Sequence, residues 1–211
     1  TGNPIRPDVV SAQRAESRRK LGISPEVFMV VITGGSRGAR TINRAMISVH
    51  EHFKRDKGIC LYHITGNLEY DKIVRELGLT DGKSFGKGSR IIKYEYDMPA
   101  VLAAADLIIC RAGAVSLAEL AARELPSILI PYPYASGDHQ TFNARVFVKA
   151  EAAKMIADKY VTEKELIQDI NDFRHQPETL ERMSEATKKI KKIYAGVDIA
   201  QLALEMTENK K

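Results

Sequence analysis

The alternation of short apolar runs with helix-period segments is the feature that most constrains how this 211-residue chain can fold. Apolar runs rich in β-branched residues recur at residues 27–33, 59–64, 90–94, 107–110, 127–130 and 154–156. Segments of helical periodicity separate them, at residues 39–53, 68–77, 98–104, 116–123 and 140–150. Strands that alternate with helices pair in parallel and carry helices on both faces of the sheet. We therefore expect an α/β fold, a Rossmann-like parallel sheet.

After the last apolar run the pattern predicts helices alone. Thr162 can cap the first of them, and Glu165, three residues on, completes a capping box. A second helix follows Pro177 and is stopped by Ala195-Gly196, and a short third helix covers residues 199–206. An α-helical C-terminal tail is therefore expected to follow the α/β domain.

The charge balance is basic but does not choose a partner by itself. Lys and Arg exceed Asp and Glu by 32 − 27 = 5, and the sequence pI is about 9.1. The densest basic run, at residues 188–192, has a helical pattern in which Ile190 and Ile193 would face inward. This favours a solvated helix face over a membrane-binding patch. No apolar run approaches the ~20 residues that a membrane span requires.

The two cysteines and the first residues indicate the setting of the chain. Cys60 and Cys110 each lie inside an apolar run, which predicts buried free thiols and a reducing, cytoplasmic environment. The chain begins at Thr1 with no secretory signal pattern, and we interpret it as an excerpt of a longer protein.

The loops that leave the carboxyl ends of parallel strands form the binding crevice of such a sheet. The first of these loops, residues 34–40, is rich in glycine, which lets the backbone approach an anion at a helix N-terminus. Arg37 and Arg40 add positive charge, so we predict a diphosphate site; the alternative is a tight turn without a ligand. No Gly-Lys-Ser/Thr follows, and no Asp or Glu ends the second strand, so neither a P-loop nor an NAD fingerprint is present.

A second glycine turn, residues 110–119, also leads from a strand into a helix. We expect both helix starts to converge on a single pyrophosphate, because each contributes unpaired N–H groups and a positive dipole end. Glu119 could accept hydrogen bonds from both hydroxyls of a ribose. The alternative is that Glu119 only complements the helix dipole.

Two further loops carry polar or aromatic residues. In residues 131–144, Asp138, His139, Gln140 and Asn143 cluster at a helix start, an array suited to sugar hydroxyls. For His139 a capping or solvent-facing role is the alternative, since no nucleophile accompanies it. Residues 94–99 could hold a flat base, although aromatic residues after a strand are more often core.

Together, these loops resemble the C-terminal domain of the MurG family, transferases that add N-acetylglucosamine to lipid I in peptidoglycan synthesis. The resemblance covers nearly the whole chain, and the segments that carry it are residues 1–6, 34–40, 97–98, 110–114, 118–119, 125–126, 131–132 and 139–144. It implies one half of a GT-B glycosyltransferase. Residues 1–25 would lead in from an N-terminal domain, residues 26–160 would form the UDP-sugar-binding domain, and residues 161–211 would pack on it or return across it.

The resemblance also implies a set of substrate-binding residues. Gly34, Gly35, Ser36 and Gly38 would meet the diphosphate, with Arg6 near the donor. The backbone of Glu95, together with Met98, would hold uracil; the family often has an apolar residue in place of Glu95. The second loop would bind phosphate and ribose, and the third would bind the GlcNAc hydroxyls: Arg111, Gly113, Ala114, Val115, Ser116 and Glu119, then His139, Gln140 and Asn143.

The implied reaction is an inverting attack of the MurNAc 4-hydroxyl on C1 of UDP-GlcNAc, giving lipid II. The implied general base lies in the N-terminal domain, as does the lipid I surface, so no catalytic residue is assigned here and this half alone is expected to be inactive. No Asp-x-Asp pair is present, so we expect neither a metal nor a cofactor. The implied location is the cytoplasmic face of the plasma membrane, as a peripheral protein, with an anionic membrane surface as a further candidate partner.

Three alternatives remain at this stage. The chain could be a stand-alone donor-binding subunit or half of a glycolipid synthase of the same superfamily. It could instead be a non-catalytic nucleotide-binding module, although no aromatic and basic platform for nucleic acid is present and no nucleic-acid partner is expected.

The tail is expected to cross back to the other domain in such enzymes, and we therefore expect it to be loosely held from residue 199 onward.

Overall fold

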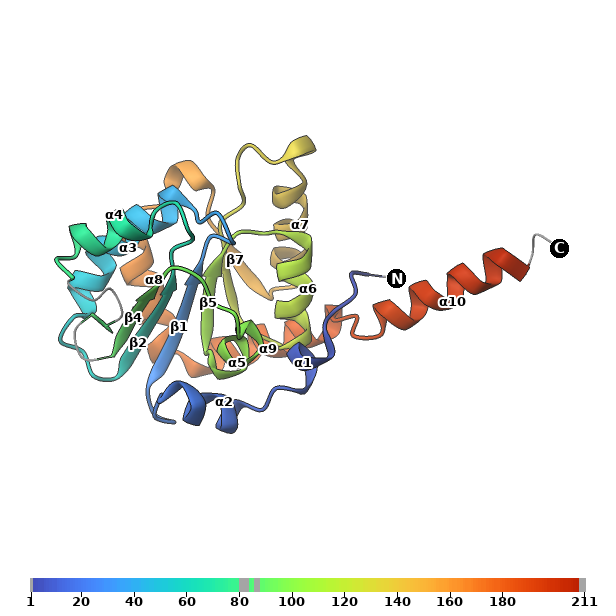
Figure 1. Ribbon diagram of the computed structural model, residues 1–211, viewed down its shortest axis with the longest axis horizontal. Coiled ribbons are helices and arrows are strands. Elements are labelled where there is room, and N and C mark those ends of the chain that lie inside the picture. Colours follow the sequence, from blue (N-terminus) through green and yellow to red (C-terminus); the bar gives the residue numbers. More distant parts are fainter. Residues whose placement is uncertain (1, 80–83, 86–87, 209–211) are drawn as a thin grey trace.

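One sheet organises the computed structural model, which describes residues 2–79, 84–85 and 88–208 (Figure 1). Within the described residues its strand order is β3-β4-β2-β1-β5-β6-β7. The strands are β1 (Phe28–Thr33), β2 (Ile59–Ile64), β3 (Ser84–Phe85), β4 (Ser89–Ile92), β5 (Leu107–Cys110), β6 (Ser127–Leu129) and β7 (Ala153–Met155). All pairs are parallel except β3 with β4. The six predicted runs are therefore confirmed as parallel strands, and β3 is an antiparallel edge strand that the sequence pattern did not predict. Thr1, where the family resemblance begins, lies outside the described residues.

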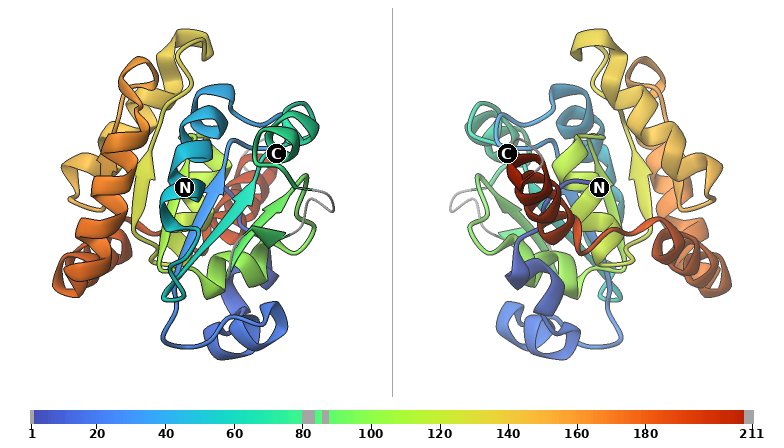
Figure 2. Two further views of the ribbon diagram at one scale, coloured as in Figure 1. Left: turned by 90° about the vertical axis from the view of Figure 1, so that its left-hand side faces the viewer. Right: turned by 90° about the vertical axis from the view of Figure 1, so that its right-hand side faces the viewer.

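Helices cover both faces of the sheet, as Figure 2 shows from two sides. The helices after the strands are α3 (Arg40–Phe53), α4 (Tyr70–Glu76), α5 (Met98–Ala104), α6 (Ala114–Ala122) and α7 (His139–Lys149), and the tail contributes α8 (Glu163–His175) and α9 (Pro177–Ile190). On one face, Met46 of α3 and Leu166 of α8 belong to one buried core. On the other face, Leu120 of α6 and Phe147 of α7 belong to a second core. Each helix therefore buries one apolar stripe against the sheet.

The strand order reverses between β1 and β5, and this position fixes where a ligand can bind. Thr33 at the end of β1 lies opposite Cys110 at the end of β5 in the parallel register. The helices that follow, α3 and α6, lie on opposite faces, so the two loops diverge and leave a crevice between them. The prediction that both glycine loops lie at one edge of the sheet is confirmed. Cys60 and Cys110 are buried free thiols, as expected.

Two helices near the N-terminus, α1 (Pro7–Ser11) and α2 (Arg14–Leu21), were not predicted. Both pack on α5. The Arg18 side chain of α2 is only 4% exposed and pairs with Asp106 at 2.6 Å. Its guanidinium also donates to the carbonyl oxygens of Ala104 and Ser24. Tertiary contacts hold this segment, which explains why its polar local sequence did not indicate it.

The C-terminal tail differs from the prediction at two points. Thr162 Oγ1 accepts from the Glu165 backbone N–H, but the Glu165 carboxylate accepts from Lys154, so only half of the capping box forms. The expected helix stop at Ala195-Gly196 is wrong. The chain leaves the helix at Lys191, where φ is −68° and ψ is 143°, and Ala195 begins α10 (Ala195–Glu208). This last helix projects from the body of the molecule (Figure 1).

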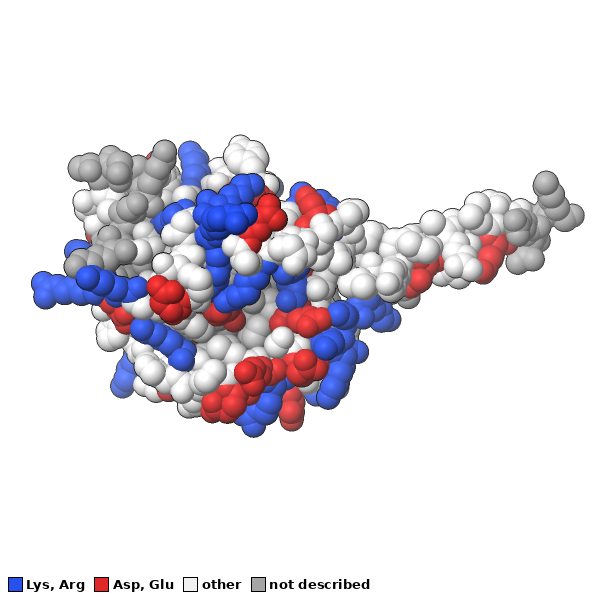
Figure 3. All heavy atoms as spheres, turned by 90° about the horizontal axis from the view of Figure 1, so that it is seen from below, with Lys and Arg blue, Asp and Glu red and all other residues white. Residues whose placement is uncertain are grey.

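The surface charges are mixed over the end of the molecule seen from below in Figure 3. On this face, basic and acidic side chains of the described residues interleave. In the basic run, Ile190 packs against the core, Lys191 pairs with Glu124, and Lys188 lies 3.5 Å from Glu185. Lys188 and Lys189 therefore lie on a solvated face at the end of α9 with Ile190 turned inward, whereas Lys191 and Lys192 follow the end of the helix and are not part of that face. Within the described residues, no helix has both the length and the apolar character needed to cross a bilayer.

Candidate functional site

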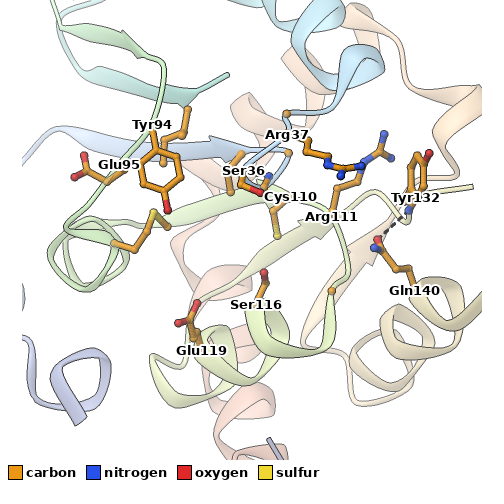
Figure 4. A pocket seen from close by; sticks show the side chains of 17 residues that line it. Ser36, Arg37, Tyr94, Glu95, Cys110, Arg111, Ser116, Glu119, Tyr132 and Gln140 are labelled. Carbon is orange, nitrogen blue, oxygen red and sulfur yellow. Dashed lines mark hydrogen bonds between the residues drawn. The ribbon is translucent and has the colours of Figure 1, made fainter. Parts of the chain in front are cut away.

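A cavity of about 490 Å³ lies at the carboxyl ends of the central strands (Figure 4). Its volume falls within the range typical of small-molecule sites. The lining residues come from the ends of β1, β2 and β5 and from the segments that follow β1, β4, β5 and β6: Thr33, Gly34, Gly35, Ser36, Arg37, Gly38, Ile64, Tyr94, Glu95, Met98, Cys110, Arg111, Gly113, Ser116, Glu119, Tyr132 and Gln140. The four loops singled out in the sequence therefore meet around one space.

The first glycine loop is a tight turn whose shape depends on two positive φ angles. Gly35 has φ +81° and Gly38 has φ +78°, and the Gly38 N–H donates to the Gly35 carbonyl oxygen at 2.9 Å. A Cβ on Gly38 would lie 2.1 Å from the Thr65 carbonyl oxygen, so only glycine fits there. Helix α3 begins directly after the loop, and its N-cap residue, Ala39, has no side chain that could cap the first N–H groups. Its first N–H groups therefore remain available to a ligand.

The second loop repeats this arrangement. Gly113 is the N-cap of α6 and has no side chain to accept from the first N–H groups, and the first turn contains no acidic residue. The first turn of α3 also lacks acidic residues. Two helix starts without a capping side chain thus flank one cavity, and their dipoles favour a negatively charged ligand between them.

A buried chain of polar side chains supports the first loop from below. The His50 Nε2 atom lies 3.1 Å from His63 Nδ1, and His63 Nε2 lies 3.0 Å from Asn43 Oδ1. The Asn43 amide donates to the Thr65 carbonyl oxygen at 2.9 Å, the same oxygen that confines Gly38. Both rings are fully buried. Burial lowers the pKa of His50 to about 3 and that of His63 well below its usual range, so both imidazoles are neutral.

We expect the buried pair of histidines to make the free energy of unfolding of the protein fall below neutral pH. Because the folded-state pKa of His50 is about 3, the unfolded chain binds more protons between that value and its ordinary pKa near 6.5. The contribution of neutral His50 to stability is fully present above pH 6.5 and is lost as the pH falls toward the folded-state pKa. At pH 5, His50 alone should lower the free energy of unfolding by about 2 kcal/mol. Urea denaturation at pH 7.5 and pH 5.0 measures this difference.

The variant His50→Asn should reduce the pH dependence, whereas His175→Asn, at an exposed site, should leave it unchanged. An identical pH dependence in all three proteins would contradict the assignment of neutral buried imidazoles.

Glu119 is the acidic side chain of the cavity wall on α6. It is partly buried, and burial raises the pKa of its carboxyl, an effect that the nearby charge of Arg6 opposes. Within the described part of the chain, no hydrogen-bond partner meets the Glu119 carboxylate. An unpaired and partly desolvated carboxylate is unfavourable in the free protein, so the position is suited to a ligand that donates hydrogen bonds.

The two ends of the cavity differ in character. Figure 4 shows Tyr94 and Glu95 at one end, Tyr132 and Gln140 at the other, and Ser36 between them. The Glu95 carboxylate accepts from Tyr62 Oη at 2.6 Å and from the Asp97 N–H at 2.7 Å. Because the side chain of Glu95 is occupied in this way, a ligand would meet the backbone of Glu95.

Gln140 is held by its carbonyl group. Its Oε1 accepts from the Ala112 N–H at 3.2 Å and the Tyr132 N–H at 3.0 Å. The Nε2 amino group is therefore the part of this side chain that can donate to a ligand.

Some predicted residues do not line the cavity; these are Arg6, Ala114, Val115, His139 and Asn143. The His139 Nδ1 atom lies 2.7 Å from the Ser136 carbonyl oxygen, and Asn143 Nδ2 donates to the Ala112 carbonyl oxygen at 3.2 Å. Arg40, expected beside the diphosphate, instead lies 3.3 Å from Glu69.

Sequence reasoning gave no site role to Thr33, Ile64, Cys110 and Tyr132, which complete the wall. Three of them end strands, a position that could have indicated them.

The chain matches the glycosyltransferase family 28 C-terminal domain over residues 29–197. It is 40% identical over 193 residues to the UDP-N-acetylglucosamine--N-acetylmuramyl-(pentapeptide) pyrophosphoryl-undecaprenol N-acetylglucosamine transferase of Desulforudis audaxviator, covering 91% of this chain and 52% of that protein. The transferase of the same name from Acetivibrio thermocellus is 36% identical over 210 residues, covering 100% of this chain and 56% of that protein. The chain thus spans about half the length of these curated relatives.

The crystal structure of Acinetobacter baumannii MurG matches with a TM-score of 0.75 at 24% identity, covering 93% of this chain and 55% of that one. This likeness confirms the expected Rossmann-like fold of one GT-B half.

Proposed function

The chain belongs to the family of glycosyltransferase family 28 C-terminal domains, and from this premise we propose that it is the donor-binding half of a transferase that moves N-acetylglucosamine from UDP-N-acetylglucosamine to the MurNAc 4-hydroxyl of lipid I. The observation that carries the proposal is the meeting of two uncapped helix starts at one cavity. A nucleoside diphosphate sugar has its negative charge at its centre, where such helix starts stabilise it best.

The order of side chains along the cavity supports the same ligand. We assign uracil to the end formed by Tyr94, the Glu95 backbone and Met98. The ribose hydroxyls would donate to Glu119, the diphosphate would lie between Ser36 and Ser116, and the sugar would reach Gln140. For this arrangement Arg6, His139 and Asn143 would have to approach the donor from outside the cavity wall.

In the proposed reaction, the acceptor 4-hydroxyl oxygen forms a bond to C1 of the sugar while the bond from C1 to the β-phosphate oxygen breaks. The electron pair of the broken bond leaves with UDP. The hydroxyl proton would pass to a general base in the acceptor-binding domain. Negative charge grows on the β-phosphate during this step, so N–H groups at the two helix starts stabilise the transition state more than the ground state. Arg111 lines the cavity but is held by other groups, so we assign it to the wall.

We place the working enzyme at the cytoplasmic face of the membrane that carries lipid I, as a peripheral protein. Residues 1–25 would lead in from the acceptor-binding domain, and α10 would return toward it. The apolar side chains of α10 support this proposal, since Leu202, Leu204 and Met206 are exposed on the projecting helix.

Calorimetric titration with UDP-GlcNAc, UDP-glucose and UDP, with EDTA present, tests the proposed donor. We expect one binding site, tighter binding of UDP-GlcNAc than of UDP-glucose, and no change on removal of EDTA, because N–H groups rather than a metal would meet the phosphates. Absence of UDP association would overturn the proposal.

The variant Gln140→Ala is expected to lose the preference for GlcNAc by about tenfold, the loss typical of one or two hydrogen bonds in a site. Affinity for UDP should change much less, because UDP lacks the sugar that Nε2 would contact. Calorimetry with UDP-GlcNAc and UDP-glucose gives the preference, and titration with UDP gives the affinity without the sugar. Equal losses for UDP-GlcNAc and UDP would show that Gln140 acts only through the Ala112 and Tyr132 backbone groups that it holds.

A further inference from the structure

The Asp158 carboxylate joins the start of α3, which follows the first glycine loop, to Arg111 in the second glycine loop. Asp158 begins the 3-10 turn η2 (Asp158–Tyr160) that follows β7. Its Oδ2 accepts from Thr41 Oγ1 at 2.9 Å, across 117 residues of sequence. Its Oδ1 lies 2.5 Å from Arg111 Nη1, and the Arg111 and Asp158 side chains are only 13% and 15% exposed. Thr41 is in the first turn of α3, and Arg111 directly follows β5, so one carboxylate connects the start of each loop-helix unit.

Arg111 extends this connection to the third loop. Its Nη1 donates to the Ile130 carbonyl oxygen at 3.0 Å and the Pro131 carbonyl oxygen at 3.1 Å. Its guanidinium also lies 5.5 Å from the centroid of the Tyr132 ring. The positive charge of Arg111 is therefore neutralised by Asp158 and directed at backbone oxygens, which makes it a fixed part of the wall.

We propose that Asp158 is a positioning residue that sets the distance between the two helix starts, and thereby the affinity for a diphosphate. This inference rests on the proposed function. The field of a helix N-terminus decays within the first turn, so a small displacement of either helix weakens its hold on an anion. Thr41 and Arg111 share one rigid partner, and this fixes the spacing of both loops.

The sign of the charge makes the proposal testable. Removing a carboxylate beside an anion site would, by electrostatics alone, strengthen anion binding. We expect the opposite: Asp158→Ala should weaken UDP binding about tenfold and Thr41→Val about threefold, magnitudes typical of residues that act on a site through another group. Uridine, which lacks the diphosphate, should bind all variants alike, whereas a general loosening of the fold would weaken both ligands.

The experiment is a titration of each protein with UDP and with uridine, followed by NMR, with thermal unfolding as the check on folding. Thr41→Ser keeps the hydroxyl and should restore the wild-type affinity for UDP, and Asp172→Ala serves as the matched control, the same acid-to-alanine change at an exposed position. If Asp158→Ala does not fold, the Thr41 pair decides the question.

Unchanged UDP affinity in the alanine and valine variants, with wild-type protein that binds UDP, would overturn the positioning role alone. Equal weakening of UDP and uridine would also overturn it. Failure of the wild-type protein to bind UDP would overturn the proposed function as well.

Discussion

Gly38→Ala is expected to abolish tight binding of UDP and to destabilise the fold. The new Cβ would lie 2.1 Å from the Thr65 carbonyl oxygen, and φ at this position is +78°. The Thr65 oxygen cannot retreat easily, because the buried Asn43 amide donates to it and Asn43 is itself held by His63. Backbone strain and overpacking each cost about 1–3 kcal/mol, so we expect a loss of roughly 3 kcal/mol in the free energy of unfolding. If the first loop shifts, UDP affinity should fall more than about 30-fold.

Gly35→Ala is the matched control for this prediction. Gly35 has nearly the same φ, +81°, but a Cβ there would meet nothing within 4 Å. The cost should therefore be the conformational one alone, about 1 kcal/mol. Urea denaturation of both variants gives the comparison, because both glycines line the cavity and only the stability separates the contact with Thr65 from a direct effect on UDP. Equal effects of the two substitutions would show that the contact between Gly38 and Thr65 does not control the loop.

Glu119→Ala is expected to weaken UDP, UDP-glucose and UDP-GlcNAc by a similar factor of about 10 to 100, the loss of hydrogen bonds to a charged group. The common factor follows because all three ligands carry the same ribose. A nucleotide without the 2′-hydroxyl sharpens the test: wild-type protein should prefer UDP to dUDP, and the variant should lose much of that preference. Calorimetry with the two nucleotides measures it.

The stability of a second Glu119 variant separates an effect on binding from an effect on folding. Burial raises the pKa of Glu119, so its ionised form destabilises the folded protein above the ordinary pKa of a glutamate. Glu119→Gln should therefore unfold at neutral pH no more easily than wild-type protein while binding UDP more weakly. Glu185→Ala, an exposed glutamate on α9, is the control and should leave UDP binding unchanged. A destabilised Glu119→Gln protein would indicate a structural role.

The sheet and the location of the cavity were predictable because they follow from local pattern. Apolar runs ending at Thr33 and Cys110 predicted two strand ends, and the parallel register places those residues side by side. Gly34, Gly35 and Gly38 marked the turn into α3, and Gly113 marked the turn into α6. Chain order and β-branched composition were sufficient for this part, since parallel sheets align the carboxyl ends of their strands.

The features that the sequence did not indicate depend on contacts between distant residues. Thr41 and Asp158 are 117 positions apart, and the imidazoles of His50 and His63 meet only because α3 packs on β2. Arg111 was assigned to the ligand, but the carbonyl oxygens after β6 hold its guanidinium. No periodicity encodes such pairings.

The tail shows the same limit at a boundary. Ala195-Gly196 matches the composition of a helix stop, yet α9 ends at Ile190 and Ala195 begins α10. Ala195 is buried, and Gly2 lies close to both Lys192 and Ala195. Packing therefore determines where this helix begins.

The most direct test of the account is an NMR titration of the isotopically labelled chain with UDP, in the presence of EDTA, that follows the backbone N–H signals of Ser36 and Ser116. One residue comes from each glycine loop, and both line the cavity. If the two helix starts bind one diphosphate, both signals shift along a single binding curve, and uridine shifts them far less. Movement of one signal alone, or two different dissociation constants, would contradict the convergence of both loops on a single ligand.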